Sequence, residues 1–174
     1  VFALIFSSIV GIAAGLRPGG IADKLAFAIS SVFISIPNFW LGIVLALLFS
    51  AHLGWLPAIG YRGFAYTILP AIVLAVELSP VLIRTLSSAV AAQMSASYVS
   101  VGHVRGLSRP RIVAHHALRN AAVPLLNLLG VQFSSLLGGV IIVEYIFDYP
   151  GLGLLTINAV LQRDFPLIQG IAIV

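Results

Sequence analysis

Two ionisable side chains lie inside a strongly apolar stretch and are the first candidates for chemistry. Glu77 and Arg84 are two helical turns apart in residues 67–92, so a helix would place them on one face. Charges in an apolar helix are costly unless they face water or each other. They could therefore line a polar path, or each could reach toward the nearest aqueous boundary. Glu144 at the end of residues 122–145 has two similar interpretations, a gate or docking residue and a carboxylate hydrated at the boundary.

The residue types of a catalytic or metal site do not assemble in this sequence. Cysteine is absent, which excludes a thiolate nucleophile and a cysteine-based metal site. His115 and His116 are adjacent and would point to different helix faces, and no HExxH or GxSxG pattern occurs. The single lysine, Lys24, lies outside any GxxxxGK phosphate-binding pattern. We expect no catalytic residue, metal ligand or cofactor in this chain, and nucleotide hydrolysis only by another chain.

The composition indicates lipid as the solvent of the elements that carry these residues. Of 174 residues, 60% are hydrophobic and 8% are charged, and the mean hydropathy is +1.13. A helix crosses the hydrocarbon core with about 20 apolar residues. Segments that predict spanning helices, one of them truncated, occupy residues 1–16, 25–51, 67–92, 122–145 and 167–174. We expect an all-α, polytopic membrane helical bundle that forms one transmembrane domain over residues 1–174, a fragment lacking its N-terminal and C-terminal parts.

Prolines and glycines occur within these segments. We expect the prolines to be accommodated as kinks in a packed membrane bundle. They are Pro37, Pro70, Pro80 and Pro124. Gly11 and Gly15 have the small-residue spacing that lets another helix approach closely, which predicts ordinary bundle packing.

Basic residues are distributed unevenly among the connections. Alternate connections share a side of the membrane, so residues 17–24 pair with 93–121, and 52–66 with 146–166. The first pair carries Arg17, Lys24, Arg105, Arg109, Arg111 and Arg119, and the second carries Arg62 and Arg163. By the positive-inside rule, residues 93–121 are expected to be cytoplasmic. Tryptophan and tyrosine in and beside the other two connections suit the level of the lipid headgroups.

Residues 93–121 are longer and more patterned than a simple turn, with four arginines and no acidic residue. Gly106 suits a left-handed helix C-terminus, and Ser108 can cap a second helix whose first turn accepts Pro110. We expect two short helices that meet at a bend and dock into a groove of a partner through basic side chains and an apolar set. The apolar set is Leu107, Ile112, Val113 and Leu118. A connection that only obeys the positive-inside rule is equally compatible with the spacing alone. Four dispersed arginines do not predict nucleic-acid binding.

Residues 98–124, YVSVGHVRGLSRPRIVAHHALRNAAVP, resemble the cytoplasmic signature loop of the permeases of binding-protein-dependent ABC importers, in the dipeptide, oligopeptide and nickel group. Motifs similar to that group also occur elsewhere, and together they cover nearly the whole chain. They are SIPNFWLG at 35–42, LGWLPAIGY at 53–61, LLGGVIIVEYIFDYPGLG at 136–153 and RDFPLIQG at 163–170. The superfamily pattern Glu-Ala-Ala, three residues, glycine falls on Ser100, Val101, Gly102 and Gly106, and only Gly106 keeps it.

The resemblance implies a type I importer permease fold, with the loop as the ATPase-coupling site. The residues assigned to it are Gly102, His103, Arg105, Gly106, Leu107, Ser108, Arg109, Arg111, His116, Arg119 and Asn120. His103 and Arg105 stand where the group has basic residues, whereas Glu77 departs from its usual apolar residue. Glu77, Arg84 and Glu144 stay candidates for the translocation path or gate.

The resemblance also implies partners in the cytoplasmic (inner) membrane. These are a second permease, expected to form a heterodimer with this chain, two cytoplasmic ATPase subunits that bind ATP and Mg, an external substrate-binding protein, and membrane lipid. The cargo could be a dipeptide, an oligopeptide, a nickel chelate or glutathione. An ion-coupled secondary transporter that uses Glu77, and less so a membrane-embedded enzyme, are the alternative functions.

Overall fold

The structure, a computed structural model, describes residues 1–173 apart from the side chains at positions 103, 135 and 137–139. All the regular elements of these residues are helices, as the all-α prediction requires. The chain forms two compact units. The first unit comprises Val1–Ser35 and Leu78–Phe133, and the second comprises Ile36–Glu77 and the residues from Ser134 onward. The prediction of a single transmembrane domain stays a prediction.

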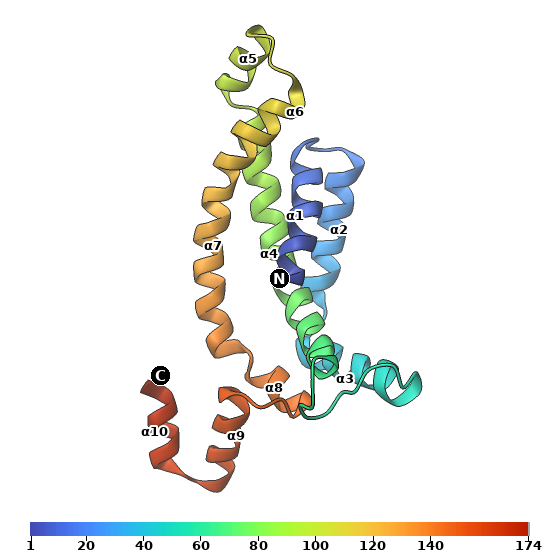
Figure 1. Cartoon of the computed structure of the whole chain (residues 1–174), viewed down its shortest axis with the longest axis vertical. Coiled ribbons are helices and arrows are strands. Elements are labelled where there is room, and N and C mark those ends of the chain that lie inside the picture. Colours follow the sequence, from blue (N-terminus) through green and yellow to red (C-terminus); the bar gives the residue numbers. More distant parts are fainter. Residues whose placement is uncertain (174) are drawn as a thin grey trace. The chain divides into compact units, whose positions relative to one another are not determined.

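The first unit consists of helices that pack lengthwise and a folded connection. Its elements are α1 (Phe2–Gly15), α2 (Ile21–Ser35), the second half of α4 (Ala65–Met94), α5 (Ser97–Val104), α6 (Arg109–Ile112), the π-helix η2 (Val113–Ala117) and most of α7 (Leu118–Gly139). Figure 1 shows α1 and α2 side by side, joined by a short turn.

Small residues of α1 form its contact with α4. A Cβ atom added to Gly15 would lie 2.6 Å from the carbonyl oxygen of Ser87 and 2.6 Å from Cβ of Val90. A Cβ atom at Gly11 would lie 3.1 Å from the carbonyl oxygen of Ile83. The close approach predicted from the glycine spacing is confirmed, and α4 of the same chain is the helix that approaches.

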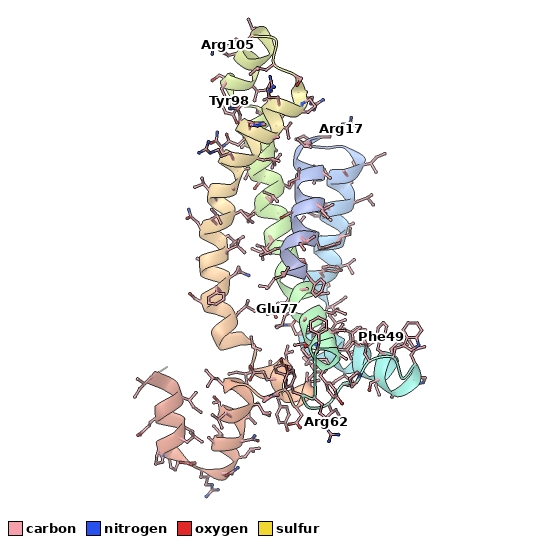
Figure 2. The ribbon with its side chains drawn as sticks, in the orientation of Figure 1. Arg17, Phe49, Arg62, Glu77, Tyr98 and Arg105 are labelled. Carbon is pink, nitrogen blue, oxygen red and sulfur yellow. The ribbon has the colours of Figure 1, made fainter. Side chains whose placement is uncertain are left out.

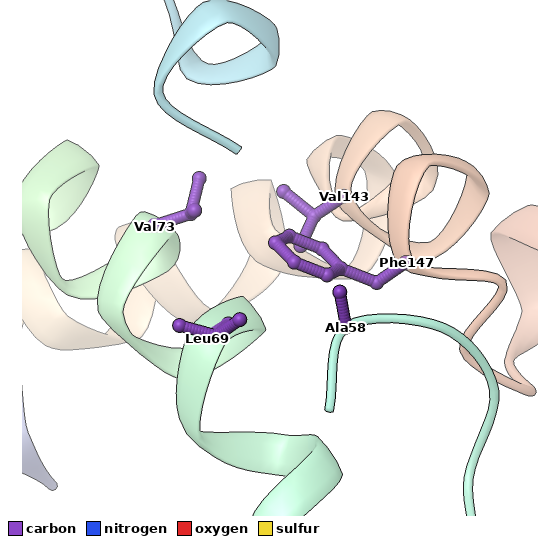
Figure 3. Packing of buried hydrophobic residues seen from close by; sticks show 5 residues of the cluster. All are labelled: Ala58, Leu69, Val73, Val143 and Phe147. Atoms are coloured by element: carbon purple, nitrogen blue, oxygen red, sulfur yellow. The ribbon is translucent and has the colours of Figure 1, made fainter. Parts of the chain in front are cut away.

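The second unit contains the remaining helices and the loop that leads into α4. Its elements are α3 (Asn38–Leu45), the π-helix η1 (Ala46–His52), the first half of α4, α8 (Ile141–Phe147), α9 (Leu152–Gln162) and α10 (Phe165–Ile173). The ring of Phe147 packs with Ala58, Leu69, Val73 and Val143 in a buried apolar core (Figure 3). This core joins the loop to α4 and α8.

Two predicted spanning segments are interrupted. The prediction of one helix over residues 25–51 is wrong, because α2 ends at Ser35 and Pro37 starts α3 with an extended backbone, φ −65° and ψ 135°. Proline disfavours helical geometry in the residue before it, which explains the break. Residues 122–145 also break, at Val140 between α7 and α8. The prolines of α4 and α7 lie inside continuous helix, as predicted.

Residues 146–166 were expected to be a connection, and they contain an 11-residue helix, α9, that the sequence analysis did not predict. The turn-forming residues before Gly151 and after Gln162 mark the ends of this helix rather than one long loop. Length and composition single out one described helix that could cross a membrane, α4, and a second if α2 and α3–η1 form one broken span. Both α1 and α9 are apolar but shorter.

Candidate functional site

The predicted coupling region is a folded module, here called the elbow, formed by α5, α6 and η2. It lies at one end of the first unit, where it joins α4 to α7 (Figure 1). The prediction of two short helices that meet at a bend is confirmed. Figure 2 shows Tyr98 and Arg105 on this module.

Gly106 forms the bend of the elbow. Its φ of +77° lies in the left-handed region, and the N–H of Leu107 donates to the carbonyl oxygen of Gly102 at 3.0 Å. This six-residue closure is the Schellman motif that ends many helices. A Cβ atom at Gly106 would meet nothing within 4 Å, so glycine is favoured here by backbone conformation alone.

Ser108 starts the second short helix through its backbone. It is the N-cap of α6, and its carbonyl oxygen accepts the N–H groups of Arg111 at 3.0 Å and Ile112 at 3.1 Å. Pro110 lies in the first turn, as predicted. The expected side-chain cap is wrong, because the Ser108 hydroxyl makes no capping hydrogen bond in α6.

The elbow has a small core of its own. Ile112 is only 1% exposed, and it packs over Gly102, where an added Cβ would lie 3.1 Å from Cδ1 of Ile112. Val99 and Ala117 are buried in the same module. The two elbow glycines therefore have different roles, since Gly102 provides space and Gly106 provides a backbone conformation.

Tyr98 contacts both Gln93, near the end of α4, and His116, in η2. Its hydroxyl donates to Oε1 of Gln93 at 2.9 Å, and its ring lies 6.3 Å from that of His116. The sequence analysis assigned no role to Tyr98 or Gln93, and the only available signal was that Tyr98 begins the recognised loop. A hollow of ≈ 230 Å³ opens beside this contact, and Arg105, Leu107 and Asn120 are among its lining residues.

The outer surface of the elbow combines positive charge with apolar groups. The exposed polar residues of the elbow include Arg105, Ser108, Arg109, Arg111 and His116, and Arg119 and Asn120 are exposed directly after it, at the start of α7. Val104 is 90% exposed. Nη2 of Arg109 lies 3.5 Å from the carbonyl oxygen of Leu16, at the end of α1. The side chain of His103 lies outside the described residues.

The two charged residues predicted for a shared path have separate surroundings. Glu77 is exposed in the second unit, whereas Arg84 is exposed in the first. The guanidinium carbon of Arg84 lies 4.9 Å from the ring centroid of Phe27, which makes a cation–π contact.

Among the described residues, no group of three or more His, Asp or Glu side chains gathers as a metal site would require.

Glu144 caps a helix that the sequence analysis missed. Its Oε2 accepts the N–H of Leu154 in the first turn of α9 at 3.0 Å. A carboxylate there satisfies a free backbone donor and faces the positive end of the helix dipole. A Cβ atom on Gly151 or Gly153 would collide with this carboxylate. Glu144 therefore has a structural role, and its role as a gate or docking residue stays a prediction.

Several of the recognised motifs meet in the second unit. The N–H of Gly60 donates to the carbonyl oxygen of Phe147 at 2.9 Å, and the rings of Tyr61 and Tyr149 pack edge to face at 5.3 Å. Gly42 of α3 lies against Phe147, where an added Cβ would be in ordinary contact with the ring at 3.5 Å. These motifs therefore specify a packed structural centre.

Comparisons with known proteins identify the family of the chain. Residues 7–174 match the family model of the binding-protein-dependent transport system inner membrane component. Proteins named glutathione transport system permease protein GsiC, from Salmonella typhimurium and Escherichia coli, are 37% and 38% identical to the chain over 169 residues. Each alignment covers 97% of this chain and 55% of the relative, so the chain spans about half the length of these curated relatives. The chain thus belongs to the family of inner-membrane components of binding-protein-dependent transport systems.

Proposed function

We propose that this chain is the membrane-spanning part of a permease in an ATP-driven importer of small peptides, and that its elbow docks into an ATPase subunit. The observation that carries this proposal is the elbow itself. A connection that only joined two helices would need neither the buried Ile112 nor the Schellman closure at Gly106. A module with its own core can hold exposed groups in a fixed arrangement for a partner.

The surface of the elbow supports a protein partner on the cytoplasmic side. Val104 would enter a partner's groove, while the surrounding arginines would meet acidic or polar groups at its rim. Closure of an ATPase pair would move the elbow as a rigid body, and α4 and α7 would carry that motion toward the membrane. ATP and Mg belong to the partner in this scheme, and this chain contributes no nucleotide site.

We propose a multi-pass topology with residues 93–121 in the cytoplasm and the loop after η1 outside. The unequal basic charge of the connections supports it. Because the chain has no cysteine, single-cysteine variants can test each side. Val104→Cys and Ile59→Cys suit the test, since these residues are 90% and 71% exposed. A membrane-impermeant thiol reagent applied outside intact cells should label residue 59 only, and labelling of residue 104 would refute the topology.

The complete transporter would contain two ATPase subunits, an external binding protein and a second permease, expected to differ from this one. Family membership supports the binding protein, whereas the second permease rests on the resemblance alone.

Cross-linking through Val104→Cys in the assembled complex tests the contact between the elbow and the ATPase subunit. The ATPase should be captured, and the control variant Val131→Cys, exposed on α7, should not capture it. Equal capture by both variants would contradict docking through the elbow.

Small peptides are the cargo that the comparisons favour. The two relatives are named for glutathione, which is itself a tripeptide. The external binding protein would select the cargo before it reaches the permease. Uptake of labelled glutathione and of a labelled dipeptide, each competed with the other and with a nickel chelate, would identify the class. Saturable uptake of the nickel chelate alone would contradict a peptide cargo.

A further inference from the structure

A pocket of ≈ 350 Å³ in the first unit lies away from the elbow core and has no role in the proposed coupling. It is bordered by α2, α4 and the turn before α2. The residues that give it chemical character are Asp23, Phe27, Arg84, Ser87 and Ser88. It therefore combines one cation, one anion and two hydroxyl groups on a partly apolar wall.

Arg84 requires an anionic or aqueous partner because of its position. It lies ten residues before the end of α4, or about 15 Å along the helix that is long and apolar enough to cross a membrane. A guanidinium on such an apolar helix is costly unless it is solvated or paired. The ring of Phe27 covers one face of the guanidinium, and this contact leaves the N–H groups at its edge able to donate.

Asp23 places an opposite charge in the same pocket. Its Oδ2 accepts the N–H of Gly19 at 2.8 Å, which fixes the carboxylate in the first turn of α2. A carboxylate has about four acceptor positions, so this bond leaves capacity for an ammonium group. The hydroxyl of Ser88 donates to the carbonyl oxygen of Thr85, and its oxygen can still accept. The pocket thus complements a group that contains both an anion and an ammonium.

The surface beside the pocket distinguishes a lipid from a peptide. Phe27 is 62% exposed, and Ile34, two helical turns further along the same side of α2, is 61% exposed. Acyl chains could cover such a surface, whereas a short peptide would leave most of it uncovered. The pocket also lies beside the turn between α1 and α2, whose basic residues indicate the membrane boundary.

We propose that this pocket binds a membrane phospholipid whose headgroup carries a primary ammonium. The phosphate pairs with Arg84, the ammonium with Asp23, and the acyl chains follow the apolar surface of α2. The proposal depends on the chain lying in a membrane and is independent of the cargo and of ATPase coupling. It can therefore fail while the proposed function holds.

The test compares lipids on the full permease complex purified in nanodiscs. The discs contain phosphatidylethanolamine, phosphatidylcholine, whose trimethylated nitrogen has no N–H donor, or phosphatidylglycerol, which has no cation. Native mass spectrometry counts the lipids kept after detergent exchange. We expect the ethanolamine lipid to be retained about 10-fold better than the choline lipid, the difference expected for one charge-assisted hydrogen bond.

Two variants test separately the roles of the Arg84 and Asp23 charges in lipid binding. Arg84→Gln should lower retention of every phospholipid, whereas Asp23→Asn should remove the preference for ethanolamine over choline and keep phosphate binding. Arg62→Gln, at an exposed arginine of the second unit, is the control and should change neither value. Equal retention of the three lipids, preference for phosphatidylglycerol, or displacement of lipid by a small peptide would each overturn the proposal. If Arg84→Gln does not fold, the comparison of lipids on the wild-type protein and the Asp23→Asn variant still test the proposal.

Discussion

Replacing Gly106 tests whether the bend of the elbow is needed for coupling. An alanine held at the observed φ of +77° costs about 1–2 kcal/mol relative to its preferred conformations. Nothing lies within 4 Å of the added Cβ, so this cost comes from the backbone and not from a steric clash. It would shift the balance between the folded and the opened elbow by a factor of about 5 to 30. Asparagine tolerates this conformation better than alanine, and β-branched valine tolerates it worse.

The assay is peptide uptake per ATP hydrolysed by the full transporter in proteoliposomes. We expect coupling to fall in the order glycine, asparagine, alanine, valine at position 106, while the permease still assembles with its ATPase. Gly19→Ala is the matched control, because Gly19 has a φ of +75° and an equally open surrounding in the turn between α1 and α2. It introduces the same backbone strain outside the elbow.

Three results would contradict this reasoning. Unchanged coupling in Gly106→Val would show that the bend is not required for transmission. An equal loss in Gly19→Ala would show that strain anywhere in the first unit is sufficient, so the elbow would have no special part. A ranking in which asparagine is as harmful as valine would indicate that the side chain, rather than the backbone, disturbs docking.

Further predictions concern packing inside each of the two units. Each predicted effect is a change in the free energy of unfolding of the permease, measured in mixed detergent. Gly15→Ala should destabilise by about 1–3 kcal/mol, because its Cβ meets a backbone oxygen at 2.6 Å, while Gly130→Ala on α7, where an added Cβ meets no heavy atom within 4 Å, should be neutral or stabilising. Glu144→Ala should cost about 0.5–2 kcal/mol by removing the α9 cap, and an unchanged value would exclude that role. Ser30 is buried, and its hydroxyl has no hydrogen-bond partner among the described residues, so Ser30→Ala should be neutral or stabilising, and a large loss would reveal a partner.

The elbow could be predicted from the sequence because its signals are local. A glycine after a helical stretch, then serine and proline two residues apart, determine where one helix ends and the next begins. These preferences act within a few residues and need no knowledge of the rest of the fold. The prediction was wrong about the Ser108 hydroxyl, since the backbone carbonyl already accepts the nearby N–H groups. It was also wrong about Ile112 as a docking residue, because this side chain is buried in the elbow core.

The proline positions show why the helix boundaries were harder to predict. Pro37 ends a helix, whereas Pro70 and Pro80 lie inside continuous α4, although all three are in apolar segments. The sequence near a proline does not say whether neighbouring helices will compensate for the lost hydrogen bond. The helix α9 was missed for a similar reason, because its cap comes from Glu144, ten residues before the N–H that it accepts.

The motifs that identify the family act mainly through backbone geometry. Gly106 bends the elbow, Gly102 admits Ile112, and Gly60 joins a loop to Phe147, yet none of these residues could react with a substrate. If the elbow couples to an ATPase as proposed, the chain changes shape instead of making or breaking bonds, so residues that fix bends and close contacts can serve that role. A charged residue can have such a structural role too, and Glu144 shows this most clearly, because its carboxylate caps the start of α9 while its role as a gate or docking residue stays a prediction.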